Sequence, residues 1–323
     1  MKFGSIDGAS IAILSRLSMS SSSYTFSFDE KQTEKLKEIL LQRGFDISPL
    51  NHGLFRATTR GVVIQAYKTG KILVQGKEAL EFAQGVIEPE ILGKASIGYE
   101  EVLHPEYFEA HAGIDECGKG DLFGPLVVAA VFVDKQSARF LVDAGIKDSK
   151  RIKSDSRLFQ LAMEVKKKAP YGFFSLSPLQ YNDLYEKKFK NLNLLLAWAH
   201  AKAYQRLLQV QSDCHRVVCD RFAHPWVLKQ SFEKIGMQDA LEQMTKAESD
   251  PAVAAASILA RAVFLEELSK LGKEIGFSLL RGASSKTVEQ AREIYLNKGK
   301  EALRKVAKMH FKTIQKILPE TSS

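Results

Sequence analysis

The chain has 323 residues, 45% of them hydrophobic, which is enough for a sizeable globular core and long enough to expect two domains. Residues 1–110 carry 12 basic and 14 acidic side chains and residues 111–323 carry 34 and 24, so the second part favours a polyanionic partner, although basic surfaces also serve solubility alone. The three cysteines lack metal-type spacing, and their odd number argues against a disulfide framework. No apolar run approaches the roughly 20 residues that cross a bilayer, so we expect a cytoplasmic protein.

The elements predicted for the N-terminal part form a small unit over residues 23–92. Residues 1–22 end in a serine run and are expected to be disordered or, if Met19 is the start, upstream sequence. Residues 24–28 alternate like a strand, and residues 29–44 show helical spacing that ends at a glycine. Three short strands within residues 54–76 and a helix over 77–87 follow.

The predicted sheet of this unit is rich in basic residues. Between Phe55 and Lys77 there are five basic side chains and no acidic one: Arg56, Arg60, Lys68, Lys71 and Lys77. Helices on one face leave the other face free, and a basic free face can lie along a phosphate backbone. A solvated surface is the alternative. The proline-containing stretch 93–110 predicts a linker.

A mixed pattern of strands and helices follows over residues 111–323. The strands expected there are 112–115, 125–133, 171–177 and 215–222, and the helices are 155–168, 192–210 and 246–268. Asp250 and Pro251 suit the N-cap and first turn of the last helix. The Ala/Ser-rich first half of that helix can pack very close to a sheet.

Four carboxylates come from three of these segments, each at a strand end or helix start: Asp115, Glu116, Asp220 and Glu248. Buried like charges repel unless cations compensate them. Hard oxygen ligands without histidine or thiolate suit Mg²⁺ or Mn²⁺, and two such ions about 4 Å apart can assist phosphodiester cleavage. The alternative is that the Asp115–Glu116 pair caps loops or forms salt bridges. Adjacent strand residues point to opposite faces, so one site requires the strand to end or bulge, which Gly118 and Gly120 permit.

The stretch "GIDECGKGDLFGPLVVAAVFV" resembles the first signature of the type 2 ribonucleases H, and the Gly118-Lys119-Gly120 triplet indicates the ribonuclease HIII branch. Further blocks occur in the family's order: "GIKDSKRI", "NLNLLLAWAHAKA", "VVCDRFA", "TKAESDPAVAAASILARAVFLEEL", "RGAS" and "AKMHFKT". The resemblance covers residues 112–315. The N-terminal unit resembles the TATA-box-binding-protein-like domain that precedes the catalytic domain in ribonuclease HIII.

The resemblance implies an α/β fold, with an RNase H-like mixed sheet flanked by helices over 111–323 and a small α+β substrate-binding domain before it. It implies that Asp115, Glu116, Asp220 and Glu248 are catalytic ligands of two Mg²⁺ or Mn²⁺ ions, with Asp250 as the fallback for Glu248. Gly118, Lys119 and Gly120 match a loop that touches ribose 2′-hydroxyls through its backbone, for which glycines allow close approach. An ordinary tight turn is the alternative. Positions expected to contact the nucleic acid are Lys147, Ser149, Lys150 and Lys246, together with Arg56, Lys68 and Lys71 of the first unit.

The activity implied is that of an endoribonuclease that cuts the RNA strand of RNA/DNA hybrids and leaves 5′-phosphate and 3′-hydroxyl ends. Two alternatives stay open: an HII-type enzyme that excises single ribonucleotides from duplex DNA, and a non-catalytic nucleic-acid-binding protein. We expect a monomer without an obligate protein partner. His200 is interpreted as a packed, hydrogen-bonded histidine, and Cys117 and Cys219 as small packing residues.

Overall fold

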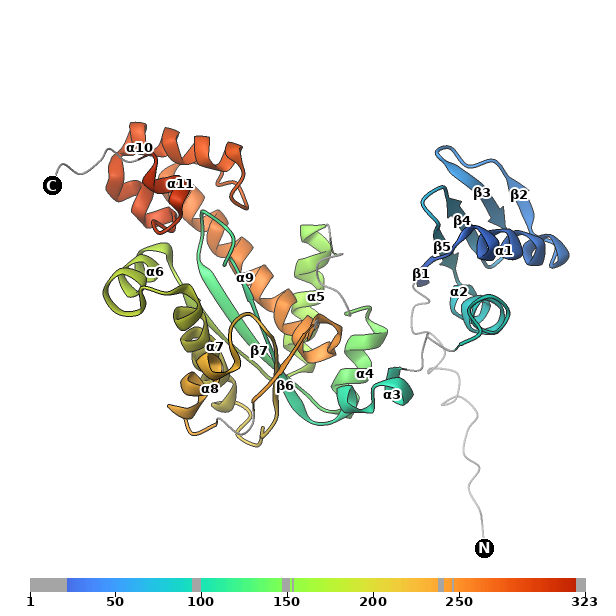
Figure 1. Ribbon diagram of the computed structural model, residues 1–323, viewed down its shortest axis with the longest axis horizontal. Helices are drawn as coiled ribbons and strands as arrows, with labels where there is room; N and C mark the ends of the chain where they lie inside the picture. The colour runs from blue at the N-terminus through green and yellow to red at the C-terminus, as the bar shows by residue number, and fades with distance from the viewer. Residues whose placement is uncertain are drawn as a thin grey trace, which may run out of the picture. The chain divides into compact units, whose positions relative to one another are not determined.

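The computed structural model describes residues 22–94, 100–146, 152, 154–237, 241–245 and 247–317. The chain divides into two compact units between Leu103 and His104 (Figure 1). Residues 1–21, which include Met19, lie outside the described residues. Each unit is described by itself below.

The first unit is a five-stranded antiparallel sheet with the order β1-β5-β4-β3-β2. Its elements are β1 (Ser22–Ser27), α1 (Glu30–Gln42), β2 (Asp46–Ser48), β3 (Gly53–Thr58), β4 (Val63–Tyr67), β5 (Lys71–Gly76), α2 (Ala79–Phe82) and η1 (Ala83–Leu92), a π-helical continuation of α2. The predicted order holds, with β2 as one additional strand. Helix α1 begins at a capping box in which Asp29 and Gln32 bond each other's backbone N–H groups.

The two faces of this sheet differ in chemistry. Alternate residues such as Phe55, Ile64 and Val74 are buried in a core shared with α1, α2 and η1. The opposite face carries one register row across four strands, formed by Thr25, Leu73, Gln65 and Arg56. This row therefore combines hydroxyl, apolar, amide and basic side chains.

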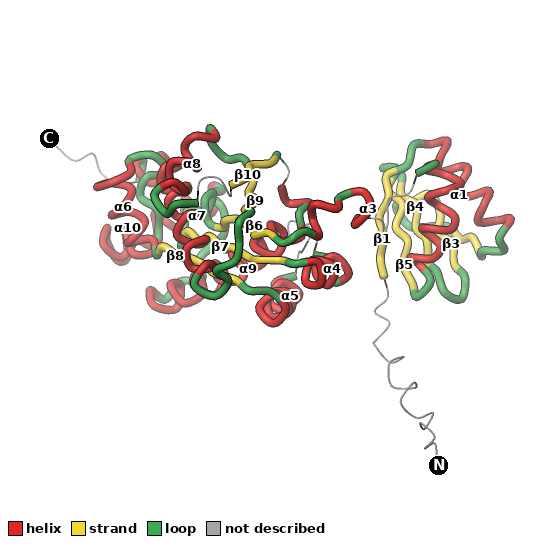
Figure 2. Tube along the Cα trace, turned by 90° about the horizontal axis from the view of Figure 1, so that it is seen from below, coloured by secondary structure: helices red, strands yellow, loops and turns green. Residues whose placement is uncertain are grey.

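The second unit contains a mixed five-stranded sheet with the order β10-β9-β6-β7-β8 (Figure 2). Its strands are β6 (His111–Cys117), β7 (Leu126–Val133), β8 (Tyr171–Leu176), β9 (Val217–Asp220) and β10 (Leu241–Met244). Its helices are α4 (Lys135–Asp143), α5 (Asp155–Lys168), α6 (Pro178–Leu184), η4 (Tyr185–Phe189), α7 (Leu192–Leu208), α8 (Pro225–Glu233), η6 (Ala247–Ser249), α9 (Pro251–Ile275), α10 (Ser285–Val306) and α11 (Lys312–Gln315). Strands β6, β9 and β10 run parallel, whereas β7 and β8 are antiparallel to their neighbours.

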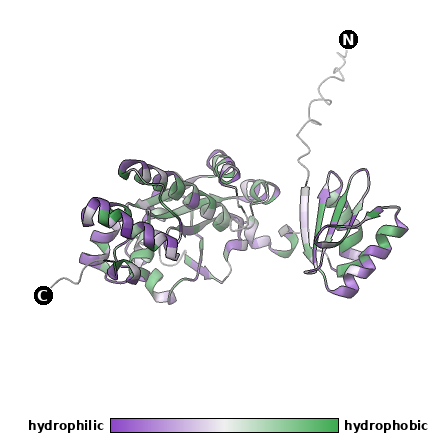
Figure 3. Cartoon of the chain, turned by 90° about the horizontal axis from the view of Figure 1, so that it is seen from above, coloured by the Kyte–Doolittle hydropathy of each residue, from purple (hydrophilic) through white to green (hydrophobic). Residues whose placement is uncertain are grey.

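Helices cover both faces of this sheet. Residues of the fully buried strand β7 alternate between two cores: Val127 and Val131 face α4, α5 and α9, whereas Val128 and Ala130 face α7 and α8. The long helix α9 lies along β6 and β7 in Figure 1. Hydrophobic residues concentrate between the sheet and the helices, and the outer helices are largely hydrophilic (Figure 3). The expected mixed sheet with flanking helices is confirmed.

The backbone of helix α9 packs directly against the backbone of β6, with no side chain between them at Gly113. A Cβ added to Gly113 would lie 2.1 Å from the backbone nitrogen of Val253, which leaves no room for any side chain there. Small residues from Ala252 to Ala256 line the facing turn of the helix. The expected close packing of this Ala-rich helix on a sheet is therefore present, and it fixes the height of α9 above the strand that carries Asp115.

The second unit begins with a short segment before β6. After α3 (Glu100–Leu103), the 3₁₀ helix η2 (Pro105–Phe108) buries Phe108 in the core beneath α4. Arg216 also donates a hydrogen bond of 2.9 Å to the carbonyl of Glu106. Part of the stretch 93–110, assigned above to a linker, thus packs on the second unit. Among the described helices none is both long and apolar enough to cross a membrane.

Candidate active site

The four carboxylates singled out from the sequence line one cavity of about 450 Å³. Asp115 and Glu116 lie near the end of β6, Asp220 is the last residue of β9, and Glu248 lies in η6 directly before α9. Strands β6 and β9 are parallel with Ile114 opposite Cys219, so Asp115 and Asp220 follow at the same edge of the sheet. The cavity also contains Ser257 and Arg261 of α9.

Asp115 and Glu116 reach this cavity from opposite faces of the sheet. Asp115 is hydrogen-bonded by Ser257 of α9, whereas Glu116 accepts a hydrogen bond of 3.0 Å from Nε2 of His200 on α7. Pairing with β9 stops at Ile114, so the last residues of β6 project beyond that neighbour, and the strand ends at Cys117. The alternation of strand side chains is therefore compatible with a single site that wraps over the sheet edge.

The two adjacent carboxylates have different electrostatic environments. Burial raises the pKa of Asp115 to about 6, and the neighbouring charge of Glu116 acts in the same direction. Burial alone would also raise the pKa of Glu116, but contacts with His200 and Lys119 lower it below the ordinary value. The pair thus concentrates negative charge. At Glu116 the contacts with His200 and Lys119 outweigh the effect of burial on the pKa, whereas at Asp115 the hydrogen bond from Ser257 does not.

A small cluster behind Glu116 joins three segments of the site. Nζ of Lys119 lies 3.6 Å from Oε1 of Glu116 and 5.2 Å from the ring centroid of Phe222. The ring of His200 also packs against Phe222, with ring centroids 4.9 Å apart. His200 is indeed packed and hydrogen-bonded, as the sequence suggested, but its partner is a carboxylate of the site, which sequence spacing does not reveal.

The four carboxylates supply oxygen ligands to the cavity. Cys117 also lines it, but burial raises the pKa of its thiol to about 12, so this residue stays protonated at neutral pH. In the part of the chain that the structure describes, no three His, Cys, Asp or Glu side chains are grouped closely enough to hold an ion as they stand. The four acids instead surround a space without converging on one point. Carboxylate oxygens free of histidine and thiolate ligands nevertheless match the preference of hard divalent cations, so the residues fit such ions chemically.

Asp250 has a different role from Glu248. Its Oδ1 accepts the backbone N–H groups of Ala252 and Val253 at 2.8 and 3.1 Å, which is the predicted N-cap of α9. Its Oδ2 accepts a hydrogen bond of 2.9 Å from Nε2 of His111, and both side chains are buried. Asp250 does not line the cavity, so the fallback for Glu248 is not supported.

The loop after β6 holds two glycines in different situations. Gly118 has φ of +93°, and a Cβ there would lie 2.1 Å from the carbonyl oxygen of Pro125. Gly120 has open space where a Cβ would point. Gly118 is therefore required by the local fold, whereas Gly120 leaves backbone accessible to a partner.

The other residues predicted to contact nucleic acid differ in where they lie. Lys147, Ser149, Lys150 and Lys246 lie outside the described residues. Arg56 and Lys71 are exposed. The strand residues next to them point into the core, so these two side chains lie on the free face of the first sheet. Lys68 is not on that face: it follows the last residue of β4 and lines a cavity with Asp29 and other residues of the α1 side.

Sequence reasoning did not single out Ser257 and Arg261. They are two polar residues four apart in the otherwise apolar first half of α9, a spacing that places them on one side of a helix. This spacing of two polar residues is the sequence feature from which a polar side of α9 could have been predicted. Cys117 and Cys219 pack in the two cores, and burial raises the pKa of both thiols, as expected of unreactive packing residues.

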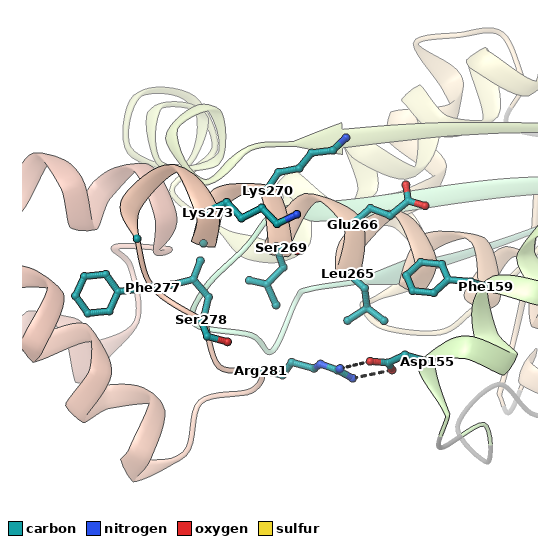
Figure 4. Close-up of a pocket in the computed structure, with 14 residues that line it drawn as sticks. Asp155, Phe159, Leu265, Glu266, Ser269, Lys270, Lys273, Phe277, Ser278 and Arg281 are labelled. Carbon is teal, nitrogen blue, oxygen red and sulfur yellow. Dashed lines mark hydrogen bonds and ion pairs between the residues drawn. The ribbon is translucent and has the colours of Figure 1, made fainter.

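A larger cavity of about 820 Å³ lies beside the second half of α9. Figure 4 shows Arg281 joined to Asp155 by two hydrogen bonds on one side of this cavity, with Lys270 and Lys273 on the other. None of the four carboxylates lines it, and its walls include Phe159, Leu265 and Phe277. Size alone therefore does not identify the reactive site, and the smaller carboxylate cavity remains the candidate.

A mixed sheet between helices, with acids gathered where parallel strands end, defines a ribonuclease H-like nuclease. Residues 112–314 match the family described as Ribonuclease HII, and residues 25–96 match a domain of unknown function, DUF3378. A ribonuclease HIII of Protochlamydia amoebophila (strain UWE25) is 40% identical over 295 residues, which cover 91% of this chain and 96% of the relative.

Two solved structures separate the branches of this class. The crystal structure of Bst-RNase HIII in complex with Mn²⁺ is 30% identical with a TM-score of 0.62, and the match covers 92% of this chain and 98% of that one. The RNase HII of Archaeoglobus fulgidus, solved in complex with PCNA, is 29% identical with a TM-score of 0.53 and covers only 63% of this chain. The chain belongs to the ribonuclease HIII family.

Proposed function

We propose that the four carboxylates of the 450 Å³ cavity bind two divalent cations, Mg²⁺ or Mn²⁺, and that the site hydrolyses the RNA strand of RNA/DNA hybrids to leave 5′-phosphate and 3′-hydroxyl ends. Membership of the ribonuclease HIII family makes the chain an endoribonuclease of RNA/DNA hybrids that depends on divalent metal. The observation that carries the finer proposal is the meeting of acids from three chain segments in one cavity.

The residues of the chain have separable tasks in this scheme. Asp115, Asp220 and Glu248 present oxygens to the cavity, while His200 and Lys119 hold the carboxylate of Glu116 in place. Cations bound there would supply an activated water and stabilise the leaving oxygen. Their charge would also relieve the repulsion between Asp115 and Glu116, which adds to the effect of burial in raising the pKa of Asp115.

Substrate recognition is proposed for two further parts of the chain. The backbone at Gly118 to Gly120 would meet a ribose 2′-hydroxyl, the group that distinguishes RNA from DNA. Lys147, Ser149, Lys150 and Lys246 would meet phosphates of the same duplex. Residues 23–92 would bind the duplex through the free sheet face, with Arg56 and Lys71 beside phosphates and hydroxyl and amide groups over the groove.

The proposal includes a monomer that acts in the cytoplasm. A carboxylate set contributed by one chain supports a monomeric site. The described cysteines are free thiols, which suits a reducing compartment.

The test is a cleavage assay that compares a long RNA/DNA hybrid with a DNA duplex that carries one ribonucleotide. Each substrate is incubated with Mg²⁺, with Mn²⁺ or with chelator, and the ends of the products are mapped. We expect rapid metal-dependent cleavage of the hybrid, 5′-phosphate ends and slow cleavage at the single ribonucleotide.

Each alternative has its own outcome. Efficient incision at the single ribonucleotide would favour an HII-type activity over the proposed preference. Hybrid binding without cleavage under either metal would favour a nucleic-acid-binding protein that has lost the chemistry.

A further inference from the structure

Lys308 is a fully buried lysine that lies outside the carboxylate cavity and has no role in the scheme above. Its Nζ donates hydrogen bonds to the backbone carbonyls of Asp121 and Gly124, at 3.0 and 2.7 Å. Both carbonyls belong to the stretch that continues the Gly118-Lys119-Gly120 loop. The ammonium group lies 5.8 Å from the ring centroid of Tyr181.

The backbone around Lys308 pairs with the same loop. The amide of Lys308 donates to the carbonyl of Leu122, and the amide of Gly124 donates to the carbonyl of Val306, both at 2.9 Å. Phe123 and Ala307 form an antiparallel bridge between these two bonds. Residues 121–124 of the loop are thus held by the end of α10 and the residues that follow it. Lys308 adds the only side-chain bonds of that segment to the loop among the described contacts.

Two further contacts fix both partners of this pairing. Asn182, buried on α6, donates to the carbonyls of Arg304 and Ala307 and accepts a bond from the amide of Met309. On the other side, Oδ1 of Asp121 accepts a bond of 2.6 Å from the amide of Gly282. The segment that carries Lys308 is therefore anchored independently of the loop, so it can serve as a fixed support for it.

Burying an ammonium group is unfavourable, and an apolar side chain of similar length would fill the same space without that cost. Burial lowers the pKa of Lys308 to about 7, although the charge of Asp121 favours the protonated form. An apolar side chain, however, could not donate hydrogen bonds to the two loop carbonyls, which Lys308 does. With these carbonyls bound inside, the peptide groups near Gly120 are the part of the loop left open.

We propose that Lys308 is a positioning residue for ribose recognition: its two hydrogen bonds hold the Gly118–Gly124 loop in the shape that meets the 2′-hydroxyl. This inference rests on the proposed function of that loop. Lys308 does not contact the carboxylates, so it affects substrate selection more than the chemical step.

The experiment compares the wild type with Lys308→Met, which keeps the length of the side chain and removes its donors. Affinities for an RNA/DNA hybrid and for a DNA duplex of the same sequence are measured without divalent metal, and kcat and KM for the hybrid are measured with Mg²⁺. We expect the preference for hybrid over DNA to fall roughly tenfold, with a raised KM and a kcat within about threefold of the wild type.

Tyr204→Phe is the matched control for lost stability. The Tyr204 hydroxyl is buried and donates to the carbonyl of Cys214, away from the loop. Its loss should lower thermal stability and leave the hybrid preference unchanged. If both variants lose preference in proportion to stability, Lys308 is a structural residue only and the inference is overturned.

Two more variants keep the test decisive. Gly120→Ala probes the loop directly: if it loses preference and Lys308→Met does not, the inference fails while the role of the loop stands. If neither loses preference, ribose recognition by this loop is itself wrong. Should Lys308→Met not fold, Asp121→Ala, which removes the Gly282 anchor at a half-buried position, must show the same loss of preference.

Discussion

At the scale of single residues, Asp115 differs most from an ordinary surface acid. It is largely desolvated, it lies beside a second carboxylate, and both effects raise its pKa. A buried carboxylate of this kind is unfavourable for folding, so its presence indicates a functional role.

Replacing Asp115 by Asn removes a ligand charge and keeps the shape. Loss of one metal ligand removes several kcal/mol of transition-state stabilisation, so hybrid cleavage should fall by at least about 100-fold. The free energy of unfolding without added metal should stay unchanged or rise slightly, because repulsion with Glu116 is relieved. Unfolding and cleavage measurements check this, with Asp213→Asn, an exposed acid of the same unit, as control. A large loss of stability would point to a structural role.

The two loop glycines should respond differently to alanine. Gly118→Ala should destabilise the unit, because its φ is +93° and the added Cβ meets the carbonyl of Pro125. Gly120→Ala should leave the melting temperature unchanged and weaken hybrid binding more than Lys119→Ala does. Melting curves and metal-free affinities of the three variants are the measurements. A greater effect of Lys119→Ala would mean that recognition here is mainly electrostatic.

Lys308 should also leave a pH signature on stability. Its pKa falls from 10.5 in the unfolded chain to about 7 in the fold, so between these values the unfolded state binds more protons and stability increases as pH rises. Asp121, Cys117, His310 and Tyr181 face the same ammonium group. Urea unfolding from about pH 7 to about pH 9.5 should therefore favour the wild type increasingly over Lys308→Met. A constant difference between the two proteins would exclude this titration.

The carboxylates were predictable from the sequence, whereas the residues that hold them were not. An acid after an apolar strand or before a helix is visible as a pattern. His200 and Lys308 have partners 84 and 184 residues away in the chain, and nothing in local spacing indicates such a partner. A buried polar residue looks like any other until the fold brings its partner to it.

At the scale of elements, the start of α9 is tied to the start of β6 by a buried pair. Nδ1 of His111 lies 2.8 Å from the carbonyl oxygen of Glu109, and its Nε2 lies 2.9 Å from Oδ2 of Asp250, which caps α9. These contacts join the strand of Asp115 to the helix that follows Glu248. They therefore stabilise the arrangement of two carboxylate-bearing segments.

His111→Ala should break this connection. Removing one partner leaves Asp250 buried with a missing donor, and such losses cost about 3 kcal/mol. His104→Ala is the matched control, since its pair with Glu106 is exposed and should contribute little. Unfolding free energies of both variants at neutral pH are the measurement. Equal small effects would show that the buried pair is dispensable.

Some elements were predicted well, but one long helix and the shortest strands were not: α10 (Ser285–Val306) has no counterpart among the helices expected from the sequence. Helix α5 has the bounds expected from its spacing, and β7 was visible as an apolar run. β2 and β10 have three and four residues and carry little β-type pattern, so they exist because a neighbouring strand pairs with them. For such strands tertiary pairing decides the structure, which a local pattern cannot show.

At the scale of the whole molecule, the first unit contributes none of the four acids and should act through affinity. Arg56→Glu together with Lys71→Glu reverses two charges on its free face. The double variant should bind hybrid more weakly, and the slope of log affinity against log salt should fall by about 2, because two phosphate contacts no longer release counterions. Its kcat at saturating hybrid should change little.

Lys68→Glu is the control, because Lys68 lies on the α1 side. A protein that starts at Gly93 keeps η2 and should fold, bind hybrid weakly and retain most of its kcat. Equal salt slopes for all of these proteins would show that the face is only solvated surface.

The two units are joined by a short stretch of chain, since η1 ends at Leu92 and η2 begins at Pro105. If the first unit binds a duplex as proposed, a connection of this length sets an effective concentration on the order of millimolar for the second unit. Two individually weak sites would then give tight overall binding. The gain exists only for a duplex long enough to reach both, so hybrid length itself becomes a selection criterion. Very short hybrids, such as those left at the end of a degraded primer, would be held no better than by one unit alone.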